Sequence, residues 1–536
     1  MDIWSWMHSL PQPDSWPEAD PYLVLELAAA SNSATATSPS NSIFLKAERT
    51  SGSNTETLVT FSICLQGFFH PSDTIKTLWI SNPCSLSASA AAPFLSLLLQ
   101  LLQDIVTLVP TAHDSRVRPP QLKLDSVPMA RTLGSCPPDE LASFFNLVFL
   151  SRLFWLCVYD APAEAGALYF QSLIPCIGTC LARDRGTAGL LTEAIGADGE
   201  LLFMRTLGYI LAKWHILSEV GGVPSSPPAI NGFCSARESY GFWIMKGYVP
   251  VSSMSRTVFN GRHDLYGRLL EAKESVLRYA LAHQQLEAVI QLEYSVRVHE
   301  RFVQVGARLD NLRIHVRRLG LRGWAEDQEG EYSGERHFPS RVRLTVGPGA
   351  GSACVAGLTL GRSTANPEQE VTTQRVVKGG FGDLKFPKVK ATARTGSTAR
   401  MRSWRWDQDA EGNTAVFEGV LCDSSGVEVA TWQPGNDTKV DPMKSGFRKR
   451  YSGANRAFTK TGGLVFAGDE YGEEVSWRLG KDDLTTMAAH GSDLKWRLGA
   501  KLWLSYRPNE VKTSYFETRC VEWCDEVDLP FQARQP

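Results

Sequence analysis

The chain has 536 residues, of which 43% are hydrophobic and 21% charged, and its formal net charge at pH 7 is -2. This length exceeds what one hydrophobic core usually serves, so we expect two or three folded domains rather than a disordered chain. The near-neutral balance of charge argues against a general nucleic-acid binder.

The cysteines and the first residues bear on the compartment. Eleven cysteines are scattered without a CxxC pair, which favours reduced thiols in a cytosol-like environment. Acidic residues and prolines occupy the start of the chain, where a secretory signal would need a basic start and an apolar run. We therefore expect a cytoplasmic protein.

The first part of the chain carries four β-rich stretches separated by turn-rich segments. This arrangement predicts an antiparallel meander. The predicted strands are residues 22–27, 42–48, 57–66 and 75–80.

Apolar helices follow the meander. Residues 93–109 carry polar side chains at three- and four-residue spacing, which leaves a wide apolar face to pack across the meander. Residues 141–159 are apolar enough to suggest a membrane span, but Arg152 near the middle favours a buried core helix. Further helices are predicted at 163–180 and 200–220.

Glycine, proline and serine cluster at residues 221–232 and mark a domain boundary. We expect an α+β domain over 1–220, a linker and irregular segment over 221–265, and a β-rich domain over 266–536.

The β-rich domain opens with a predicted helix at 269–285, after which the pattern changes to alternation of apolar and polar residues. The alternation shifts by one residue around Asp310 and Asn311, which indicates a bulge or bend. About a dozen short strands follow without helices between them. The pattern predicts an all-β sandwich or barrel. For the whole chain we expect no transmembrane segment.

One turn in this domain resembles a calcium loop. Asp407, Asp409 and Glu411 take alternate positions in RSWRWDQDAEGN. Gly412 follows, and Glu418 lies where such a loop places its closing carboxylate. Because the flanking residues alternate like strands, the other interpretation is a charged hairpin turn with Gly412 and Asn413 in positive-φ conformations.

The strand before this turn carries Trp404 and Trp406 on one face, beside arginines at 400 and 402. Such a strand could line a ligand pocket or lie against another domain.

A second candidate site is the basic and aromatic stretch KSGFRKRYSGANRAFTK at residues 444–460. Cations with aromatic neighbours suit a partner that bears phosphate groups, and the alternative is a solvated loop whose aromatic rings dock on the β core. The candidate anion-binding residues are Lys444, Arg448, Lys449, Arg450, Tyr451 and Arg456.

Acidic residues, including Glu300, Asp310 and Glu335, lie among the members of a weaker basic face and favour a paired surface there. The basic members are Arg297, Arg313, His315, Arg317, Arg318, Arg341 and Arg343. No local enzyme motif such as GxSxG, HExxH or a Walker loop occurs, so we name no catalytic residue and no cofactor. Cys520 and Cys524 have no nearby histidine, which favours structural cysteines over a metal pair.

Several long segments carry a family resemblance, among them MDIWSW, FFNLVFLSRLFWLCVYDAP and KTSYFETRCVEWCDEVDLP. In these segments the chain resembles a family of plant proteins. The resemblance spans nearly the whole chain and implies a plant source, without implying an activity.

The sequence thus favours a non-enzymatic binding or scaffold protein whose β domain presents the basic-aromatic loop to an anionic lipid or a protein partner. Two alternatives stay open. The β domain could be a barrel that carries an apolar small molecule, or an enzyme whose catalytic groups come together from distant strands.

Overall fold

The structure is a computed structural model, and the chain divides into two compact units. The first unit contains residues 1–235, 248–286 and 317–333, and the second contains 236–247, 287–316 and 334–536. The described residues are 2–11, 16, 22–30, 41–51, 57–69, 74–85, 94–112, 122–183, 185–219, 233–239, 241–252, 283–320, 336–349, 355–361, 369–381, 389–401, 404–421, 463–467, 474–480, 494–507 and 518–529.

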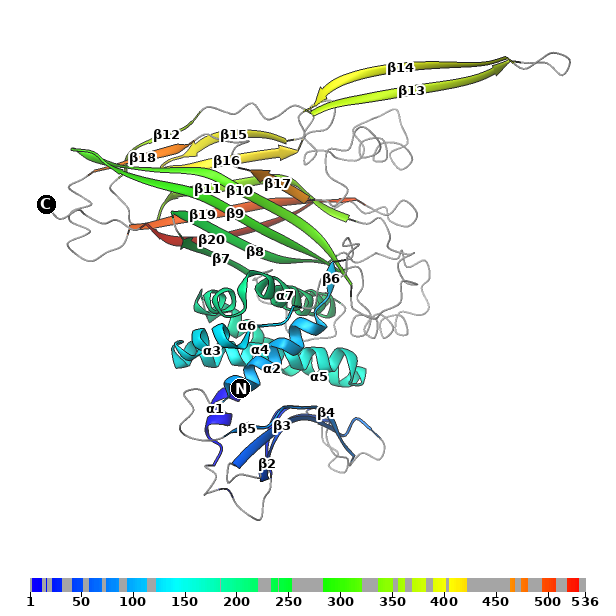
Figure 1. Ribbon diagram of the computed structural model, residues 1–536, viewed down its shortest axis with the longest axis vertical. Coiled ribbons are helices and arrows are strands. Elements are labelled where there is room, and N and C mark those ends of the chain that lie inside the picture. Colours follow the sequence, from blue (N-terminus) through cyan, green and yellow to red (C-terminus); the bar gives the residue numbers. More distant parts are fainter. Residues whose placement is uncertain are drawn as a thin grey trace. The chain divides into compact units, whose positions relative to one another are not determined.

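An antiparallel meander forms the sheet of the first unit, as predicted (Figure 1). Its strands run in the order β1-β2-β3-β4, and the short strand β5 also pairs with β3. The bounds are β1 Tyr22–Ala29, β2 Ser42–Ser51, β3 Thr57–Gln66, β4 Ile75–Ile80 and β5 Cys84–Ser85. Alternate residues of β3, Phe61 and Ile63, are fully buried, which is the period-two pattern that identified these strands.

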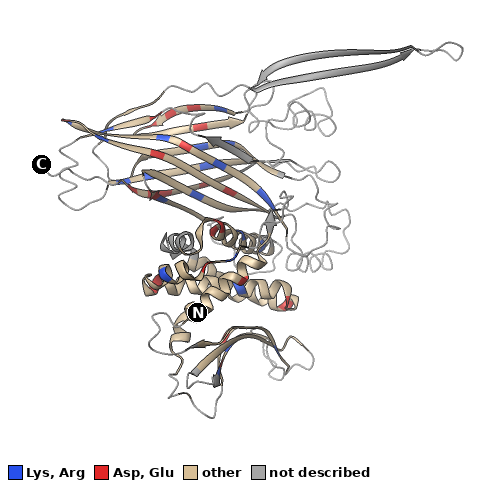
Figure 2. Ribbon diagram, viewed as in Figure 1, with Lys and Arg blue, Asp and Glu red and all other residues tan. Residues whose placement is uncertain are grey.

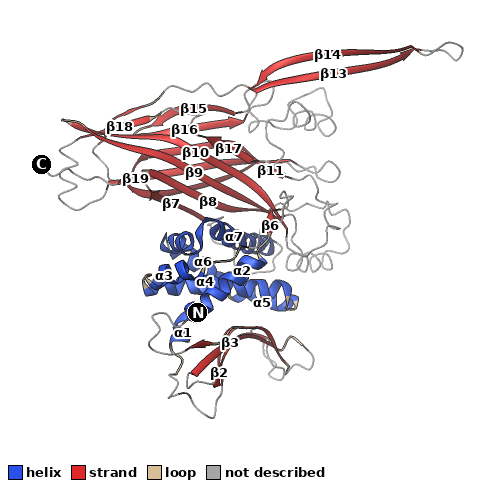
Figure 3. Ribbon diagram, viewed as in Figure 1, coloured by secondary structure: helices blue, strands red, loops and turns tan. Residues whose placement is uncertain are grey.

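Seven helices are described, all in the first unit (Figure 3). Their bounds are α1 Ile3–His8, α2 Leu95–Leu108, α3 Ser126–Gly134, α4 Pro138–Tyr159, α5 Ala163–Ser172, α6 Ile174–Arg183 and α7 Arg185–Glu219. The single helix predicted at 163–180 is two helices, because Pro175 has no amide hydrogen to continue the hydrogen-bond ladder of α5. α7 begins earlier than predicted and is kinked at Gly196, where φ is +70°.

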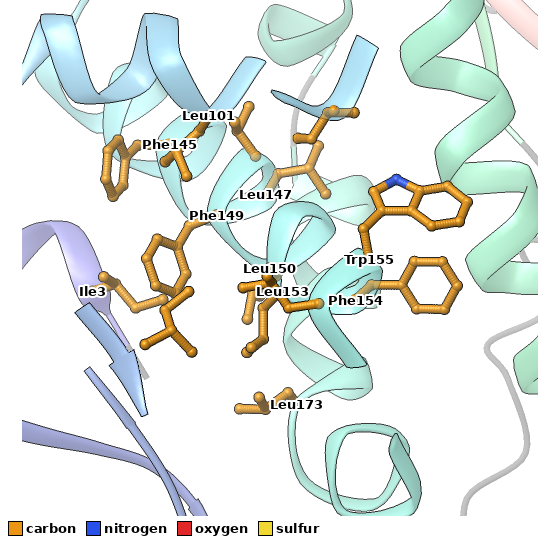
Figure 4. Packing of buried hydrophobic residues seen from close by; sticks show 14 of the residues in the cluster. Ile3, Leu101, Phe145, Leu147, Phe149, Leu150, Leu153, Phe154, Trp155 and Leu173 are labelled. Carbon is orange, nitrogen blue, oxygen red and sulfur yellow. The ribbon is translucent and has the colours of Figure 1, made fainter. Parts of the chain in front are cut away.

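One hydrophobic core joins the meander to the helices. It contains Phe61 of β3, Leu101 of α2, and Phe145 and Trp155 of α4. Figure 4 shows the α4 side chains spread around the helix, with Phe145 and Trp155 pointing to different sides. α4 is apolar on all sides because it is surrounded by other elements of this core.

A buried arginine explains how α4 fits a protein core. α4 is long and apolar enough to cross a membrane, and 78% of its most apolar window is buried inside the structure. Arg152, near its middle, is 7% exposed, and its Nε donates to Asp104 Oδ2 of α2 at 3.1 Å. Trp79 Nε1 of β4 donates to the same carboxylate oxygen at 3.1 Å. Asp104 therefore ties together a strand and two helices.

Two larger sheets are built mainly from residues of the second unit. The first has the order β12-β18-β10-β9-β8-β7, with β17 and β6 also paired to β10. The bounds are β6 Thr111–Ala112, β7 Phe233–Ser239, β8 Phe242–Ser252, β9 His283–Val298, β10 Phe302–Gly320, β12 Val355–Thr359, β17 Gly463–Ala467 and β18 Val475–Gly480. The second sheet has the order β15-β16-β11-β19-β20. Its bounds are β11 Arg336–Pro348, β15 Trp404–Glu411, β16 Thr414–Leu421, β19 Leu494–Arg507 and β20 Thr518–Leu529.

A two-stranded hairpin completes the described strands. β13 Gln369–Phe381 and β14 Val389–Met401 pair in continuous antiparallel register. Within the described part of the chain they form a sheet of their own.

The α+β fold is as predicted, and two further local differences concern the strands. β7 and β8 lie in the 221–265 segment expected to be linker and irregular structure. Residues 283–285, expected to end a helix, begin the strand β9, and the rest of that predicted helix lies outside the described residues. The expected bend in β10 agrees with its burial, because the buried positions change from odd to even numbers across Asp310 and Asn311.

Tryptophans fill the space between the two large sheets. The ring of Trp243 on β8 stacks on Trp496 of β19 with centroids 5.9 Å apart, and Trp477 of β18 meets Trp496 edge-on at 5.2 Å. Both ends of the strand order are joined across the sheets by side chains. Asp525 Oδ2 of β20 accepts from the Ala236 amide of β7 at 2.7 Å, and Gln408 Oε1 of β15 accepts from the Gly361 amide after β12 at 2.8 Å. The two sheets form a sandwich.

We expect Asp104→Ala to lower the free energy of unfolding by about 2–3 kcal/mol, because it leaves the buried Arg152 guanidinium without this carboxylate. Urea denaturation of the full chain measures the change. The control is Glu48→Ala, which breaks the more exposed Lys46–Glu48 pair of the same unit and should cost less than about 1 kcal/mol. Equal effects of the two substitutions would contradict this account of Arg152.

Candidate functional site

The four carboxylates of the predicted calcium turn lie on the β15–β16 hairpin, where Asp407 is opposite Glu418. Arginines contact three of them. Arg405 Nε lies 3.2 Å from Asp407 Oδ2. Arg343 and Arg341 of the neighbouring strand β11 pair with Glu411 and Glu418, respectively.

The fourth carboxylate bonds to its own backbone, since Asp409 Oδ1 accepts from the Ala410 amide at 2.8 Å. In the described residues, no three side chains among His, Cys, Asp and Glu gather as metal ligands. A calcium ion at this turn would have to compete with the guanidinium groups for the same oxygens. Gly412 has φ +62°, as expected for a hairpin turn, and calcium binding is the alternative tested below.

The tryptophans of β15 belong to the framework. Trp404 and Trp406 lie on one face of the strand with ring centroids 6.3 Å apart. Trp406 is 1% exposed and its ring covers Gly419 of β16, where a Cβ would come within 2.8 Å of the ring. Residue 400 belongs to β14, which lies in a different sheet from β15, and residue 402 lies outside the described residues.

The basic-aromatic loop at residues 444–460 lies outside the described residues. Its six candidate anion-binding residues are therefore not placed. They are Lys444, Arg448, Lys449, Arg450, Tyr451 and Arg456.

Charges on the five-stranded sheet are largely paired across strands. Lys501 of β19 lies 2.9 Å from Glu522 of β20, next to the Arg341–Glu418 pair and the Arg343–Glu411 pair. The guanidinium of Arg341 also lies 4.9 Å from the centre of the Trp503 ring. Arg341 and Arg343 are therefore paired, but with Glu418 and Glu411 of the β15–β16 hairpin and not with the acidic residues that the sequence suggested.

The two C-terminal cysteines lie on the same sheet. Cys520 and Cys524 are exposed on β20, and Arg497 Nε of β19 donates to Cys524 Sγ at 2.8 Å. Residues four apart on a strand are separated by about 13 Å, so these thiols lie too far apart for a disulfide or for shared zinc ligation.

A different basic and aromatic group lies at the turn between β9 and β10. The His299 amide donates to the Phe302 carbonyl at 2.9 Å, which closes a tight turn over Glu300 and Arg301. The rings of His299 and Phe302 stack at 4.4 Å.

The neighbouring strand β18 adds a cation to this turn. β18 pairs with β10 so that Gly480 is opposite Phe302, and the Arg478 guanidinium lies 5.5 Å from the centre of the Phe302 ring. We call the group the cationic tip, and its members are Arg297, His299, Arg301, Phe302 and Arg478.

One carboxylate, that of Glu474, contacts the strand β9 beside the cationic tip. Glu474 Oε1 accepts from Ser295 Oγ at 2.8 Å, and its Oε2 lies 3.6 Å from Arg297 Nη2. For Arg301 and Arg478, no carboxylate lies within 4.0 Å in the part of the chain that the structure describes. Figure 2 shows basic residues at this end of the hairpin. The tip is held in shape by stacking and hydrogen bonds and leaves two guanidinium groups exposed to partners.

A buried lysine is the most perturbed basic group described. Lys213 of α7 is 3% exposed, its Nζ lies 5.0 Å from the centre of the Tyr209 ring, and burial lowers its pKa to about 7. Desolvation disfavours the charged ammonium and so causes the shift. Lys213 is packed in the helical core, so we expect its protonation to be coupled to folding.

Sequence reasoning missed the cationic tip because it weighed the basic residues as a whole face. The segment VRVHERF carried a local signal, since one arginine and two aromatic rings flank a two-residue turn that itself contains a second arginine. Arg478 lies 177 positions after Arg301 in the sequence. Only the pairing of β18 with β10 brings it to the cationic tip.

No protein-family model matches the chain, and no curated protein matches it. Among solved structures, the chain is similar to the Clostridium perfringens NetB toxin in its membrane-inserted form. The similarity has 8% sequence identity and a TM-score of 0.20, and it covers 55% of this chain and 93% of the toxin chain. A TM-score of this size does not establish a shared fold.

We expect calcium to leave the melting temperature of the protein unchanged, because arginines already neutralise Glu411 and Glu418. Differential scanning calorimetry with calcium or with a chelator measures this. Asp409→Ala should behave like the wild type in both conditions. A calcium-dependent rise in the melting temperature that Asp409→Ala abolishes would establish the metal site instead.

Lys213 predicts a pH dependence of stability with a definite sign. Its pKa rises from about 7 in the folded chain to its ordinary value of 10.5 on unfolding, so the unfolded chain binds more protons between these pH values. Stability should therefore rise with pH in this window, by at most about 1.4 kcal/mol per pH unit from this group.

Lys213→Met should remove that dependence and be more stable than the wild type at pH 7, with the difference shrinking toward pH 9.5. Urea denaturation at several pH values measures the difference in unfolding free energy. Lys76→Met, at an exposed lysine of the same unit, is the control and should show no such trend. Parallel pH profiles for wild type and Lys213→Met would contradict the assignment.

Proposed function

We propose that this chain is a non-enzymatic binding protein whose β unit engages an anionic partner through the cationic tip. The single observation that carries the proposal is the presence of exposed guanidinium groups beside stacked rings at one strand end. The sequence favoured the same class of function but assigned it to the basic-aromatic loop at 444–460 instead of the cationic tip. The basic-aromatic loop at 444–460 remains a second proposed contact.

The guanidinium groups at the tip differ from those elsewhere on the β unit. On the five-stranded sheet, Arg341 and Arg343 each have a carboxylate partner, and their charge is satisfied within the fold. Arg301 and Arg478 are exposed, and neither has an ion pair among the described residues. Guanidinium groups bind phosphate and carboxylate oxygens through paired hydrogen bonds, so unpaired ones favour an anionic ligand.

The shape of the tip also favours binding. The turn is closed by a backbone hydrogen bond, the His299 and Phe302 rings are stacked, and Arg478 lies over Phe302. A group that is already ordered loses less conformational freedom when it binds, which leaves more of the interaction energy for affinity. The acidic residues Glu300 and Glu474 limit the excess of positive charge, so we expect modest affinity and strong dependence on salt.

Retention on heparin-agarose, a soluble polyanion attached to a matrix, tests this proposal. We expect the wild-type chain to bind at low salt, and the double substitution Arg301→Glu and Arg478→Glu to elute at clearly lower salt. Arg131→Glu and Lys76→Glu, two exposed cations of the first unit, together make the same change in net charge and should elute close to the wild type.

Loss of retention in the control variant as great as in the tip variant would show that only net charge matters. That result, or a wild type that heparin does not retain at low salt, would overturn the proposal. Thermal unfolding of each variant checks that the fold is intact.

A further inference from the structure

We infer that the partner of the cationic tip is the surface of an anionic lipid bilayer, and that Val298 enters the bilayer interface. This rests on the proposed function and adds the class of partner. The observation that carries it is an exposed aliphatic side chain next to the unpaired cations.

The position of Val298 follows from the turn geometry. Because His299 and Phe302 close the turn, Val298 lies opposite Val303 on the sheet face that turns toward the sandwich interior. Val303 is fully buried, whereas Val298 is 58% exposed. The row of inward-facing apolar residues therefore continues to the strand end, where the side chain of Val298 is more than half exposed.

The two faces of the tip differ in chemistry. Alternate residues of a strand point to opposite faces, so Arg297 and His299 lie on the outer face and Val298 on the inner one. The Phe302 ring lies on the outer face between His299 and Arg478. Cations, rings and an aliphatic side chain are thus presented together at one strand end.

A soluble polyanion would satisfy the guanidinium groups and leave Val298 in water. The interface of an anionic bilayer satisfies both, because phosphate and carboxylate headgroups lie just above the acyl chains. An aromatic ring beside the cations is also favoured at this depth. Charge and apolar surface together therefore match a lipid surface better than a soluble anion.

The charges that face the tip set the expected strength of binding. Arg297, Arg301 and Arg478 are opposed by two acids, Glu300 at the turn and Glu474 at the start of β18. Counted over these arginines and acids, the net excess is one positive charge. Binding should be reversible, dependent on anionic lipid, and weakened by salt.

Vesicle flotation tests the inference. The full chain is mixed with vesicles of phosphatidylcholine containing phosphatidylserine, or with vesicles of phosphatidylcholine alone. We expect flotation only with phosphatidylserine. The Arg301→Glu and Arg478→Glu double variant should lose at least about 25-fold in partitioning, at roughly five-fold for each cation.

Val298→Ser is the decisive variant, because it removes apolar surface and leaves the charge unchanged. It should reduce partitioning into phosphatidylserine vesicles roughly tenfold and leave elution from heparin-agarose as in the wild type. Val127→Ser is the matched control, since Val127 of α3 is 64% exposed in the first unit. It should float like the wild type.

The outcomes separate the two proposals. A chain that binds heparin but does not float with phosphatidylserine vesicles, or a Val298→Ser variant that floats like the wild type, overturns the lipid inference and leaves the proposed function. A chain that binds neither probe overturns both. Equal losses for Val298→Ser and Val127→Ser would also overturn the role given to Val298, and thermal unfolding verifies that each variant is folded.

Discussion

The β unit depends on the burial of large aromatic side chains between two sheets. Trp243 and Trp477 from one sheet meet Trp496 from the other, and their rings fill the space that the two backbones leave. Because strand residues alternate, each inward tryptophan forces its neighbours in sequence outward. The charged residues of these strands are therefore confined to the outer faces and the strand ends.

Position on the sandwich then decides what each charge can do. On the outer face of the five-stranded sheet, neighbouring strands bring opposite charges together, as in the Arg341–Glu418 and Lys501–Glu522 pairs. At a strand end there are fewer neighbours to supply a carboxylate. Arg301 and Arg478 lie at such an end, and the stacked pair of His299 and Phe302 gives them a fixed surrounding. The alternation of strand residues that buries the tryptophans thus leaves ion pairs on the outer face and exposed guanidinium groups at the cationic tip.

In the first unit, one buried charge also needs a partner within the fold. α4 has the composition of a membrane span, but Arg152 at its middle requires an anion within the fold. Asp104 supplies it, and Trp79 donates to the same carboxylate. These hydrogen bonds hold β4, α2 and α4 in one relative arrangement. Apolar packing alone would define that arrangement less precisely, because it has no directional contacts. Lys213 is a second buried cation of this unit, and burial lowers its pKa.

The sequence by itself determined the elements that have a strong local period. The four meander strands, the helices at α2 and α4, and the shift of alternation near Asp310 follow from spacing alone, because these patterns reflect burial on one face. Two helices were predicted with the wrong limits. The proline at 175 divides one of them, and the true start of α7 lies in a segment of weak period. β7 and β8 were not predicted because their residues show no clear alternation.

The sites needed the tertiary structure. The spacing of Asp407, Asp409 and Glu411 suggested a metal ligand set, but strand pairing brings arginines of β11 against two of the four predicted carboxylates. The sequence alone could have predicted only part of the cationic tip. Arg301 and Phe302 are adjacent in the sequence, whereas Arg478 is distant from both. The spacing of apolar residues in the sequence determines which face of its strand a residue lies on. The residue that it contacts on that face comes from a strand distant in the sequence, so the contact is determined only by the tertiary structure.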